Sequence, residues 1–175
     1  MSLVLILGCM FSGKSKALMS KINEWKAIGK KCIIINHTFD TRCGEEIRTH
    51  EGTTCKATKL TTLDEFEQWK EYDVIGIDEA QFFPDIVSVV KRFMEHGIQV
   101  VCAGLSGDYR RKPFESICGL ISLSSDIIHK KALCVHCANG TPAIFSKRLV
   151  SMEQRVLTGG TDKYEPVCLV HFGSK

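Results

Sequence analysis

The chain has 175 residues, of which 44% are hydrophobic and 25% charged, so it is long enough for one domain, or one domain with a small appendage. This composition excludes a disordered or fibrous chain, and a net charge of +3 is too small to indicate a nucleic-acid or membrane partner by itself. Nine cysteines are unusual, and an odd number cannot pair completely within one chain. The N-terminus lacks the basic region of a signal peptide, and no run approaches the ~18 apolar residues of a membrane span. We therefore expect a reducing, cytoplasmic location in which clustered thiols bind metal.

Four short apolar runs predict buried strands. They lie at residues 3–7, 32–35, 74–77 and 100–103, and each is continuously hydrophobic rather than alternating. Continuous hydrophobicity is typical of parallel strands that are covered on both faces of a sheet.

Helical patterns lie between these runs. Residues 14–28 carry an apolar stripe that ends before Gly29, and residues 85–95 carry another that ends before Gly97. Residues 63–69 form a shorter candidate. The alternation of strands and helices predicts an α/β fold with a parallel sheet and right-handed crossovers.

Two parts of the chain lack these patterns. Residues 40–59 have no strong period and are expected to include a long loop. After about residue 130 the apolar stripes disappear and the cysteines come in pairs. We therefore expect an α/β domain at residues 1–131 and a small second domain at residues 132–175.

A phosphate-binding motif follows the first predicted strand and opens the first predicted helix. Its glycines allow the backbone to fold around phosphate oxygens, which the N–H groups of the helix N-terminus then bind. Lys14 would neutralise phosphate charge, and the Ser15 hydroxyl would bind Mg²⁺. The motif has the pattern G-x-x-x-x-G-K-[ST] and consists of Gly8, Cys9, Met10, Phe11, Ser12, Gly13, Lys14 and Ser15. It predicts an ATP site.

An acidic pair, Asp78 and Glu79, follows the predicted strand at residues 74–77. Ligands of parallel sheets bind at this edge, so Asp78 is a candidate to hold Mg²⁺ beside the phosphate loop. Glu79 suits proton removal from an attacking hydroxyl, either of a sugar or of water. The alternative is an acidic pair that only solvates the strand end. Phe82 and Phe83 come next, and the residue type favours a place in the core over stacking on a base.

Two further pairs have the spacing of metal ligands: Cys134 with Cys137, and Cys168 with His171. Two such pairs predict a tetrahedral structural Zn²⁺ site with three thiolates and one imidazole. His136 lies inside the first pair and is an alternative ligand. Zinc would fix the base of the segment between the pairs, so we expect a metal defect to affect that segment before the phosphate loop.

The remaining cysteines receive other interpretations. Cys32, Cys102 and Cys118 are predicted to be small buried hydrophobic residues. Cys43 and Cys55 fall in the predicted long loop.

Together these motifs resemble the type II thymidine kinases, the family with a RecA-like P-loop domain and a zinc-bound lasso domain. The resemblance covers nearly the whole chain and rests on residues 10–15, 75–86, 111–114, 146–149 and 159–164 with the two metal-ligand pairs. It implies phosphorylation of the 5′-hydroxyl of thymidine, and of deoxyuridine, for DNA-precursor salvage, with ATP, Mg²⁺ and structural Zn²⁺. It also implies a homotetramer whose partner is a small molecule, not nucleic acid or a membrane.

The resemblance also assigns roles to single residues. Glu79 matches the catalytic base, and Asp78 matches the acidic position near Mg²⁺. The implied phosphate-binding residues beyond the loop are Asp40, Thr41, Arg42, Asp78 and Gln81. The implied substrate-binding residues are Met10, Phe82, Leu105, Tyr109, Phe114, Ser146, Arg155, Val156, Leu157, Thr158, Gly159 and Tyr164. The backbone of residues 155–159 is expected to recognise the edge of the base.

Some positions depart from the family pattern. Cys9 stands where proline is common, and its thiol, at a helix N-terminus beside Lys14, is expected to have a lowered pKa. Ser106, Asp108 and Tyr109 also differ from the usual residues, and the Tyr109 hydroxyl needs a hydrogen-bond partner.

Two other functions fit parts of the sequence. One is a P-loop ATPase with a zinc knuckle that binds nucleic acid through the basic residues 110–112 and 147–148, although the net charge of +3 disfavours it. The other is a nucleoside monophosphate kinase, whose phosphate acceptor is already ionised and would not depend on Glu79.

Overall fold

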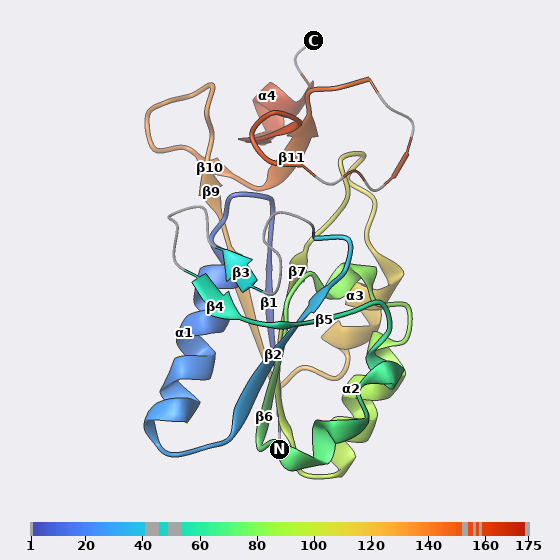
Figure 1. Cartoon of the computed structure of the whole chain (residues 1–175). Coiled ribbons are helices and arrows are strands. Elements are labelled where there is room, and N and C mark those ends of the chain that lie inside the picture. Colours follow the sequence, from blue (N-terminus) through green and yellow to red (C-terminus); the bar gives the residue numbers. More distant parts are fainter. Residues whose placement is uncertain are drawn as a thin grey trace.

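A six-stranded, entirely parallel sheet forms the centre of the molecule, in the order β5-β2-β6-β7-β1-β8. The computed structural model describes residues 2–40, 46–48, 54–151, 154–155, 157 and 159–173. The strands are β1 (Leu3–Gly8), β2 (Cys32–His37), β5 (Thr58–Leu60), β6 (Val74–Ile77), β7 (Gln99–Leu105) and β8 (Asp126–Lys130). Helix α1 (Lys14–Ala27) covers one face, and α2 (Ile86–Glu95) and α3 (Glu115–Ile121) cover the other (Figure 1). The predicted α/β fold with a parallel P-loop sheet is confirmed.

The four predicted strands are all present, but the sequence did not indicate β5 and β8. These two strands form the edges of the sheet. Residues of β8 are mostly exposed or half-buried, and β5 has only three residues. An edge strand that is not covered on both faces has no continuous apolar run, so the pattern that identified the central strands could not identify them.

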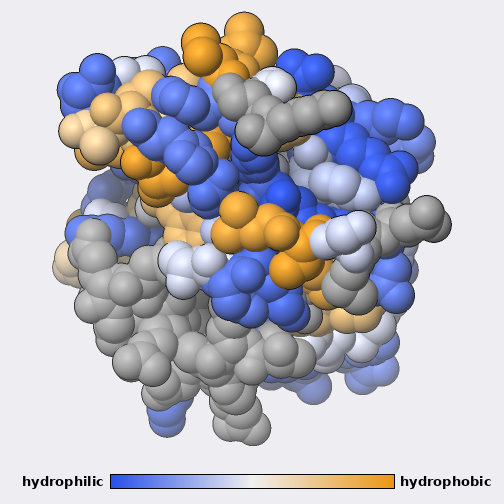
Figure 2. Space-filling model, turned by 90° about the horizontal axis from the view of Figure 1, so that it is seen from above, coloured by the Kyte–Doolittle hydropathy of each residue, from blue (hydrophilic) through white to orange (hydrophobic). Residues whose placement is uncertain are grey.

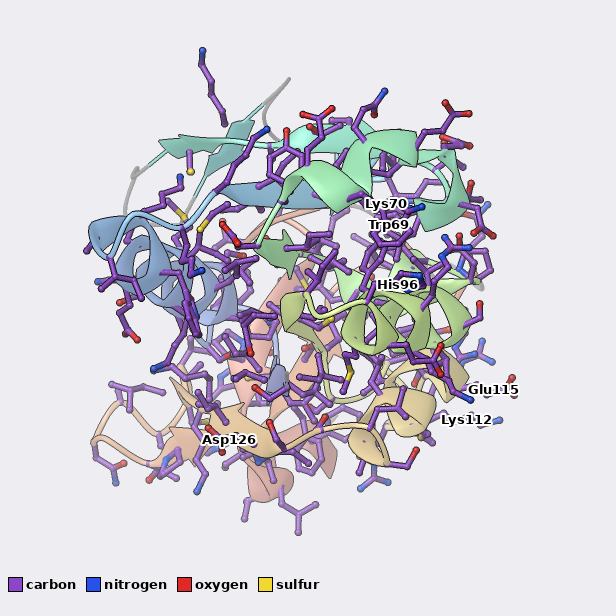
Figure 3. The ribbon with its side chains drawn as sticks, turned by 90° about the horizontal axis from the view of Figure 1, so that it is seen from below. Trp69, Lys70, His96, Lys112, Glu115 and Asp126 are labelled. Carbon is purple, nitrogen blue, oxygen red and sulfur yellow. The ribbon has the colours of Figure 1, made fainter. Side chains whose placement is uncertain are left out.

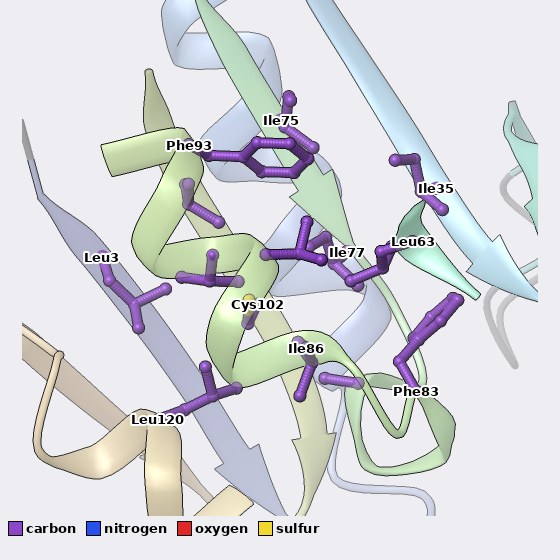
Figure 4. Close-up of a cluster of buried hydrophobic side chains, with 14 of the residues drawn as sticks. Leu3, Ile35, Leu63, Ile75, Ile77, Phe83, Ile86, Phe93, Cys102 and Leu120 are labelled. Carbon is purple, nitrogen blue, oxygen red and sulfur yellow. The ribbon is translucent and has the colours of Figure 1, made fainter. Parts of the chain in front are cut away.

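The core divides into one hydrophobic cluster on each face of the sheet. On the α1 face, Ile22 packs so closely on Gly76 of β6 that a Cβ atom there would lie 3.1 Å from the Ile22 side chain. On the other face, Phe93 of α2 points toward Ile75 among other fully buried side chains (Figure 4). Both clusters consist of residues that precede residue 132, so the sheet has a core that does not depend on the C-terminal part of the chain.

The helix predicted at residues 63–69 is replaced by two 3₁₀ turns, η1 (Leu63–Glu65) and η2 (Glu67–Glu71). Leu63, Phe66 and Trp69 are buried at a spacing of three, which matches the three residues per turn of a 3₁₀ helix. The Trp69 ring packs on Phe93 of α2, with 5.3 Å between ring centroids, and on His96 just after this helix, at 5.1 Å (Figure 3). The prediction of helical structure is correct, but the helices are of the 3₁₀ type and not one continuous helix.

A small unit covers the edge of the sheet at which the strands end (Figure 1). Its elements are β9 (Ala132–Leu133), β10 (Pro142–Ala143), β11 (Phe145–Arg148), β12 (Tyr164–Val167) and α4 (Leu169–Gly173). Strand β9 pairs with β10, and β11 pairs with β12, both antiparallel. These strands have two to four residues, too few for a periodic pattern in the sequence.

The predicted loop at residues 40–59 contains further strands. β3 (Glu46–Arg48) and β4 (Thr54–Lys56) pair antiparallel, and β5 follows directly. Cys55 lies on β4, and Cys43 lies outside the described residues. The sequence did not indicate these strands, because strands of three residues are too short to show a period.

The predicted burial of three cysteines is only partly correct. Cys102 is fully buried in β7, Cys32 is half-buried, and Cys118 is exposed on α3. Cys118 lies on the side of α3 that faces away from the sheet, whereas Ile117 and Leu120 of the same helix enter the core. Among the described helices, none has both the length and the apolar composition needed to cross a bilayer.

Candidate active site and metal centre

The phosphate loop, residues 8–15, joins the end of β1 to the start of α1. A Cβ atom at Gly8 would lie 2.4 Å from the carbonyl oxygen of Lys130, so only glycine lets the two backbones approach. Gly13 has a φ of 79°, a left-handed conformation that also favours glycine. The glycines predicted for a phosphate loop are therefore required by its geometry.

Cys9 is central to the hydrogen bonds of this loop. The Oγ of Ser12 and the Nζ of Lys14 both donate to the Cys9 carbonyl oxygen, at 2.8 and 2.7 Å. The Cys9 thiol donates to the carbonyl oxygen of Ala143 at 3.4 Å. Burial raises the pKa of this thiol, although the charge of Lys14 acts in the opposite direction. The expectation of a lowered thiol pKa is wrong, because removal from water outweighs the nearby ammonium.

Asp78 lies fully inside the protein at the end of β6. Its Oδ1 accepts a hydrogen bond from the backbone N–H of Glu79 at 3.0 Å, and its Oδ2 is buried without a hydrogen-bond partner among the described residues. Burial raises the pKa of Asp78, the charge of Glu79 raises it further, and Ser15 and Lys14 of the phosphate loop lower it. A buried carboxylate oxygen without a donor, beside a lysine and a hydroxyl, suits a bound cation.

Glu79 is held in an unusual conformation beside Asp78. Its φ of 53° is left-handed, which is uncommon for a residue other than glycine and often marks a functional site. The side-chain amide of Gln81 donates to Glu79 Oε2 at 2.6 Å, and the Gln81 Oε1 accepts from the backbone N–H of Leu105 at 3.0 Å. Gln81, which was predicted to bind phosphate, thus fixes the carboxylate of Glu79 relative to the end of β7.

Asp40 ends the turn after β2 and is buried. Its Oδ2 accepts from the Asn36 side-chain amide at 2.9 Å, and its carbonyl oxygen accepts from Lys59 Nζ at 2.6 Å. Thr41 and Arg42, which were predicted to approach the nucleotide phosphates, lie outside the described residues.

The two phenylalanines after the acidic pair have different environments. Phe83 is fully buried in the core, as the residue type favours. Phe82 is half-buried, and its ring meets that of Phe39 edge-on at 5.8 Å between centroids. Phe39 is 53% exposed. Phe82 therefore lies at the boundary between the core and the surface, where an aromatic ring can contact a ligand.

Two aromatic rings predicted to contact substrate each lie under a guanidinium group. The Arg148 guanidinium carbon is 3.6 Å from the centroid of Tyr109, and that of Arg155 is 4.7 Å from the centroid of Phe114. The hydroxyl of Tyr109 accepts a hydrogen bond from Arg110 Nε at 2.7 Å, which provides the partner that it needs.

Arg148, the last residue of β11, bonds to the segment that precedes β12 (residues 154–163). Its guanidinium donates to the carbonyl oxygens of Gln154 and Arg155 and to the Tyr164 hydroxyl, at 2.5, 3.0 and 2.7 Å. The Tyr164 hydroxyl in turn donates to the Leu157 carbonyl oxygen at 3.0 Å. Backbone groups of this segment are thus held by two side chains, one of which was not among the predicted site residues.

Some of the remaining predicted substrate residues are described by the structure and others are not. Met10 lies in the phosphate loop, and Leu105 ends β7 in register with the start of that loop. Gly159 is half-buried in the segment before β12. Val156 and Thr158 lie outside the described residues.

Asp108 and Arg155 form an ion pair between the loop after β7 and the segment before β12. Arg155 Nε lies 2.9 Å from Asp108 Oδ2, and the side chain of Asp108 is only 2% exposed against 47% for Arg155. Asp108 Oδ1 also accepts the backbone N–H groups of Arg110 and Lys112 at 2.9 and 2.8 Å. Asp108 was noted only as a departure from the family pattern, because no sequence signal pairs two residues so far apart.

The four predicted metal ligands meet in the small unit. The Nδ1 atom of His171 lies 3.5, 3.3 and 3.4 Å from the sulfur atoms of Cys134, Cys137 and Cys168, and all four ligand atoms lie within 4.8 Å of one another. A tetrahedral Zn²⁺ with ordinary bond lengths would separate sulfur and nitrogen by about 3.5 Å. The cluster is therefore compatible with zinc.

Two thiols of this cluster have pKa values shifted in opposite directions. Burial would raise the pKa of Cys134, but backbone N–H groups of Cys168, Cys137 and His136 act more strongly together and lower it. Burial raises the pKa of Cys137, a hydrogen bond with Thr141 lowers it, and hydrogen bonds with the Cys134 and Cys168 thiols raise it.

His136 does not join the cluster. Its Nε2 lies 2.7 Å from Glu165 Oε1, and its ring is tilted at 35° against that of His171, with 5.3 Å between centroids. Of the two histidines considered, the structure therefore brings His171 to the cysteines, and His136 packs beside it.

The family model and the related proteins that match this chain carry the same description. The sequence model of the family described as Thymidine kinase matches residues 1–172. The chain is 41% identical over 165 residues to the thymidine kinase of Myxoma virus (strain Uriarra), covering 94% of this chain and 92% of the viral protein. It is 40% identical over 165 residues to that of Vaccinia virus (strain Western Reserve), with the same coverage of 94% and 92%. It is 40% identical over 169 residues to thymidine kinase 1 of Dictyostelium discoideum, covering 93% of this chain and 74% of that protein.

The ion pair between Asp108 and Arg155 generates a stability prediction. A double-mutant cycle with Asp108→Asn and Arg155→Met, measured by urea unfolding, should give a coupling energy of about 0.5–2 kcal/mol. Asparagine retains the oxygen that accepts the loop N–H groups, so the cycle isolates the ion pair. The exposed pair Lys21 and Glu24 is the control and should couple by less than about 0.5 kcal/mol. Equal coupling in the two cycles would contradict the prediction.

Proposed function

The chain belongs to the thymidine kinase family, and from this premise we propose that it transfers the γ-phosphoryl group of ATP to the 5′-hydroxyl of thymidine. The observation that carries this proposal is the position of Glu79. Its carboxylate is oriented by Gln81 and adjoins Asp78, which interacts electrostatically with Lys14 and Ser15 of the phosphate loop. A fixed carboxylate beside a phosphate loop suits an acceptor that must lose a proton.

ATP would bind with its phosphates on residues 8–15. The N–H groups of the α1 N-terminus and the Lys14 ammonium supply the positive potential that the β- and γ-phosphates require. Asp40 lies near this edge of the sheet, after β2. By analogy with the family, the proposed phosphate-binding set also includes Thr41, Arg42, Asp78 and Gln81.

Mg²⁺ would be held by Ser15 and Asp78. The buried, unpartnered Oδ2 of Asp78 fits this ion, because a hard cation prefers carboxylate and hydroxyl oxygens. When bound, the ion would neutralise charge on the phosphate oxygens.

Glu79 would accept the proton of the 5′-hydroxyl as the hydroxyl attacks. Gln81 holds Oε2 of this carboxylate and so restricts its rotation. The strained backbone of Glu79 agrees with a side chain whose position matters more than its local stability. A nucleoside monophosphate kinase would not need such a group, because its acceptor is already ionised.

The nucleoside would lie among Phe82, Leu105, Tyr109, Phe114 and Tyr164. The aromatic rings offer flat apolar surface for the base and sugar. The backbone of residues 155–159 would recognise the edge of the base, and Arg148 supports it through the carbonyl oxygens of Gln154 and Arg155. Rigid backbone donors and acceptors suit this purpose because they survive changes in side chains.

The alternative function, nucleic-acid binding, has less support. Arg110, Lys147 and Arg148 line an open cavity of about 460 Å³. However, Arg110 bonds to Tyr109, Lys147 to the His171 carbonyl oxygen and Arg148 to the segment before β12. Basic side chains with intramolecular roles are less suited to a phosphate backbone than an unoccupied basic stripe.

The proposal includes several properties that follow from the family resemblance. The chain would divide into an ATP-binding domain at residues 1–131 and a zinc-binding lasso domain at residues 132–175. It would act in the cytoplasm as a homotetramer in the salvage of DNA precursors. Size-exclusion chromatography with light scattering tests the oligomeric state.

A phosphoryl-transfer assay with ATP and Mg²⁺ tests the function. Thymidine should be phosphorylated fastest among the four deoxynucleosides, and deoxyuridine should also be a substrate. Thymidine, but not single-stranded DNA, should raise the melting temperature. No turnover with thymidine, together with stabilisation by single-stranded DNA, would favour the alternative function.

Replacement of Glu79 tests the base. Glu79→Gln should lower kcat by about 10²-fold or more, because the amide cannot accept the proton. ATP affinity, measured by calorimetry, should change little, since the phosphate loop is intact. Near-normal kcat in this variant would remove Glu79 from the role of base.

Metal analysis tests the zinc site. The purified chain should contain about one Zn²⁺ per chain. His171→Ala should lose most of this metal because it removes a ligand, whereas His136→Ala should retain it. The reverse result for the two histidines would assign the fourth ligand to His136.

A further inference from the structure

We propose that Ser146 is a positioning residue for the phosphate loop, and that β11 transmits the order of the zinc-binding unit to the ATP site. The inference rests on the proposed function in one respect, since it takes residues 8–15 as the ATP site. It goes beyond that function because it connects metal binding to ATP affinity.

The first observation is a hydrogen bond between the two units. The backbone N–H of Met10, in the phosphate loop, donates to the Ser146 Oγ at 2.9 Å. Ser146 is only 6% exposed, so little water competes for this bond. The family resemblance implies that Ser146 contacts substrate, but its hydroxyl oxygen is engaged here by the phosphate loop.

The second observation is that one side of the phosphate loop belongs to the core of the small unit. Cys9 packs in the same hydrophobic cluster as Ala132, Ala143 and Val167. Its thiol also donates to the Ala143 carbonyl oxygen, across 134 positions of the sequence. Two adjacent residues of the loop, Cys9 and Met10, are therefore held by two nearby positions of the small unit.

The third observation is the set of contacts along β11. Ser146 accepts from Met10, and Lys147 Nζ donates to the carbonyl oxygen of the metal-ligand candidate His171 at 3.0 Å. Arg148 donates to the carbonyl oxygens of Gln154 and Arg155 in the segment before β12. Three consecutive residues thus reach the phosphate loop, the metal cluster and the proposed nucleoside segment.

The path from the metal cluster to the phosphate loop is short. Strand β12 ends directly before Cys168, and it pairs with β11 so that Ser146 lies opposite Pro166. A metal on Cys168 and His171 would fix the end of β12 and the start of α4, and hence the neighbouring β11. Figure 2 views the molecule from this end, where the small unit covers the edge of the sheet.

External support matters for this loop because of its own composition. Gly8 and Gly13 are conformationally permissive, so the loop has more backbone freedom to lose when it binds phosphate. A hydrogen bond that fixes Met10 before ATP arrives reduces that cost. The sequence led us to expect that a metal defect would spare the phosphate loop at first, whereas these contacts indicate that ATP binding responds as well.

The experiment measures ATP affinity directly, by calorimetry without nucleoside, in Ser146→Ala and Ser146→Thr. Ser146→Ala removes the acceptor of one hydrogen bond and should raise the ATP Kd by about three- to tenfold. Ser146→Thr keeps the hydroxyl and should restore affinity to within about twofold of the wild type. Ser151→Ala, an exposed serine of the same unit, is the matched control and should leave the Kd unchanged.

Zinc content and melting temperature are measured on every variant. A raised ATP Kd with unchanged zinc in Ser146→Ala supports the positioning role. An unchanged ATP Kd, a rise confined to the thymidine KM, or a loss of zinc in Ser146→Ala would each overturn it. The wild type is first assayed with thymidine, so a chain that binds ATP but phosphorylates no thymidine refutes the proposed function and leaves the Ser146 comparison intact.

Removal of zinc by a chelator tests the second part. The sheet has its own core, so circular dichroism should show it still folded. The ATP Kd of the wild type should rise by more than about twofold, and that of Ser146→Ala by less, because the variant has already lost the connection. An ATP Kd that is the same with and without zinc in the folded wild type would disprove the coupling.

Discussion

The parallel register of β6, β7 and β1 determines where the chemistry of this protein takes place. Parallel strands all end at the same edge of a sheet, and here Gly8 of β1 lies beside Leu105 of β7, while Ile77 of β6 lies beside Cys102. The phosphate loop and the acidic pair therefore emerge side by side, although about seventy positions separate them in the sequence. Gln81 then reaches from one strand end to the next and orients the carboxylate of Glu79.

The small unit packs on that edge of the sheet and shares a hydrophobic cluster with the phosphate loop. Its strands are too short to be stable alone, and its cluster of three cysteines and one histidine is compatible with zinc, which would cross-link such a unit. Cys9 belongs to the phosphate loop by sequence and to the core of the small unit by packing. The boundary expected near residue 131 therefore separates two parts of the chain that share side-chain contacts across the site.

Burial influences the pKa values of side chains in the site as strongly as neighbouring charges do. Asp78 is fully buried beside another carboxylate, which raises its pKa, and the phosphate loop only partly compensates. Cys9 shows the same principle, since desolvation decides the direction of its pKa shift despite the adjacent Lys14. Sequence proximity to a lysine indicated the opposite direction, because the sequence carries no information on how much water reaches the thiol.

The sequence by itself determined the central strands, the two main helices, the phosphate loop, the acidic pair and the ligand spacing of the metal cluster. Each of these is a local pattern whose physical cause acts over a few residues: continuous burial, helical period, glycine geometry or the reach of a ligand pair. The structure confirms the predicted His171 beside the three cysteines. Only the tertiary structure decided that Asp108 pairs with Arg155 and that Ser146 holds Met10. These contacts join residues brought together by folding, and neither residue type nor spacing along the chain specifies such a partner.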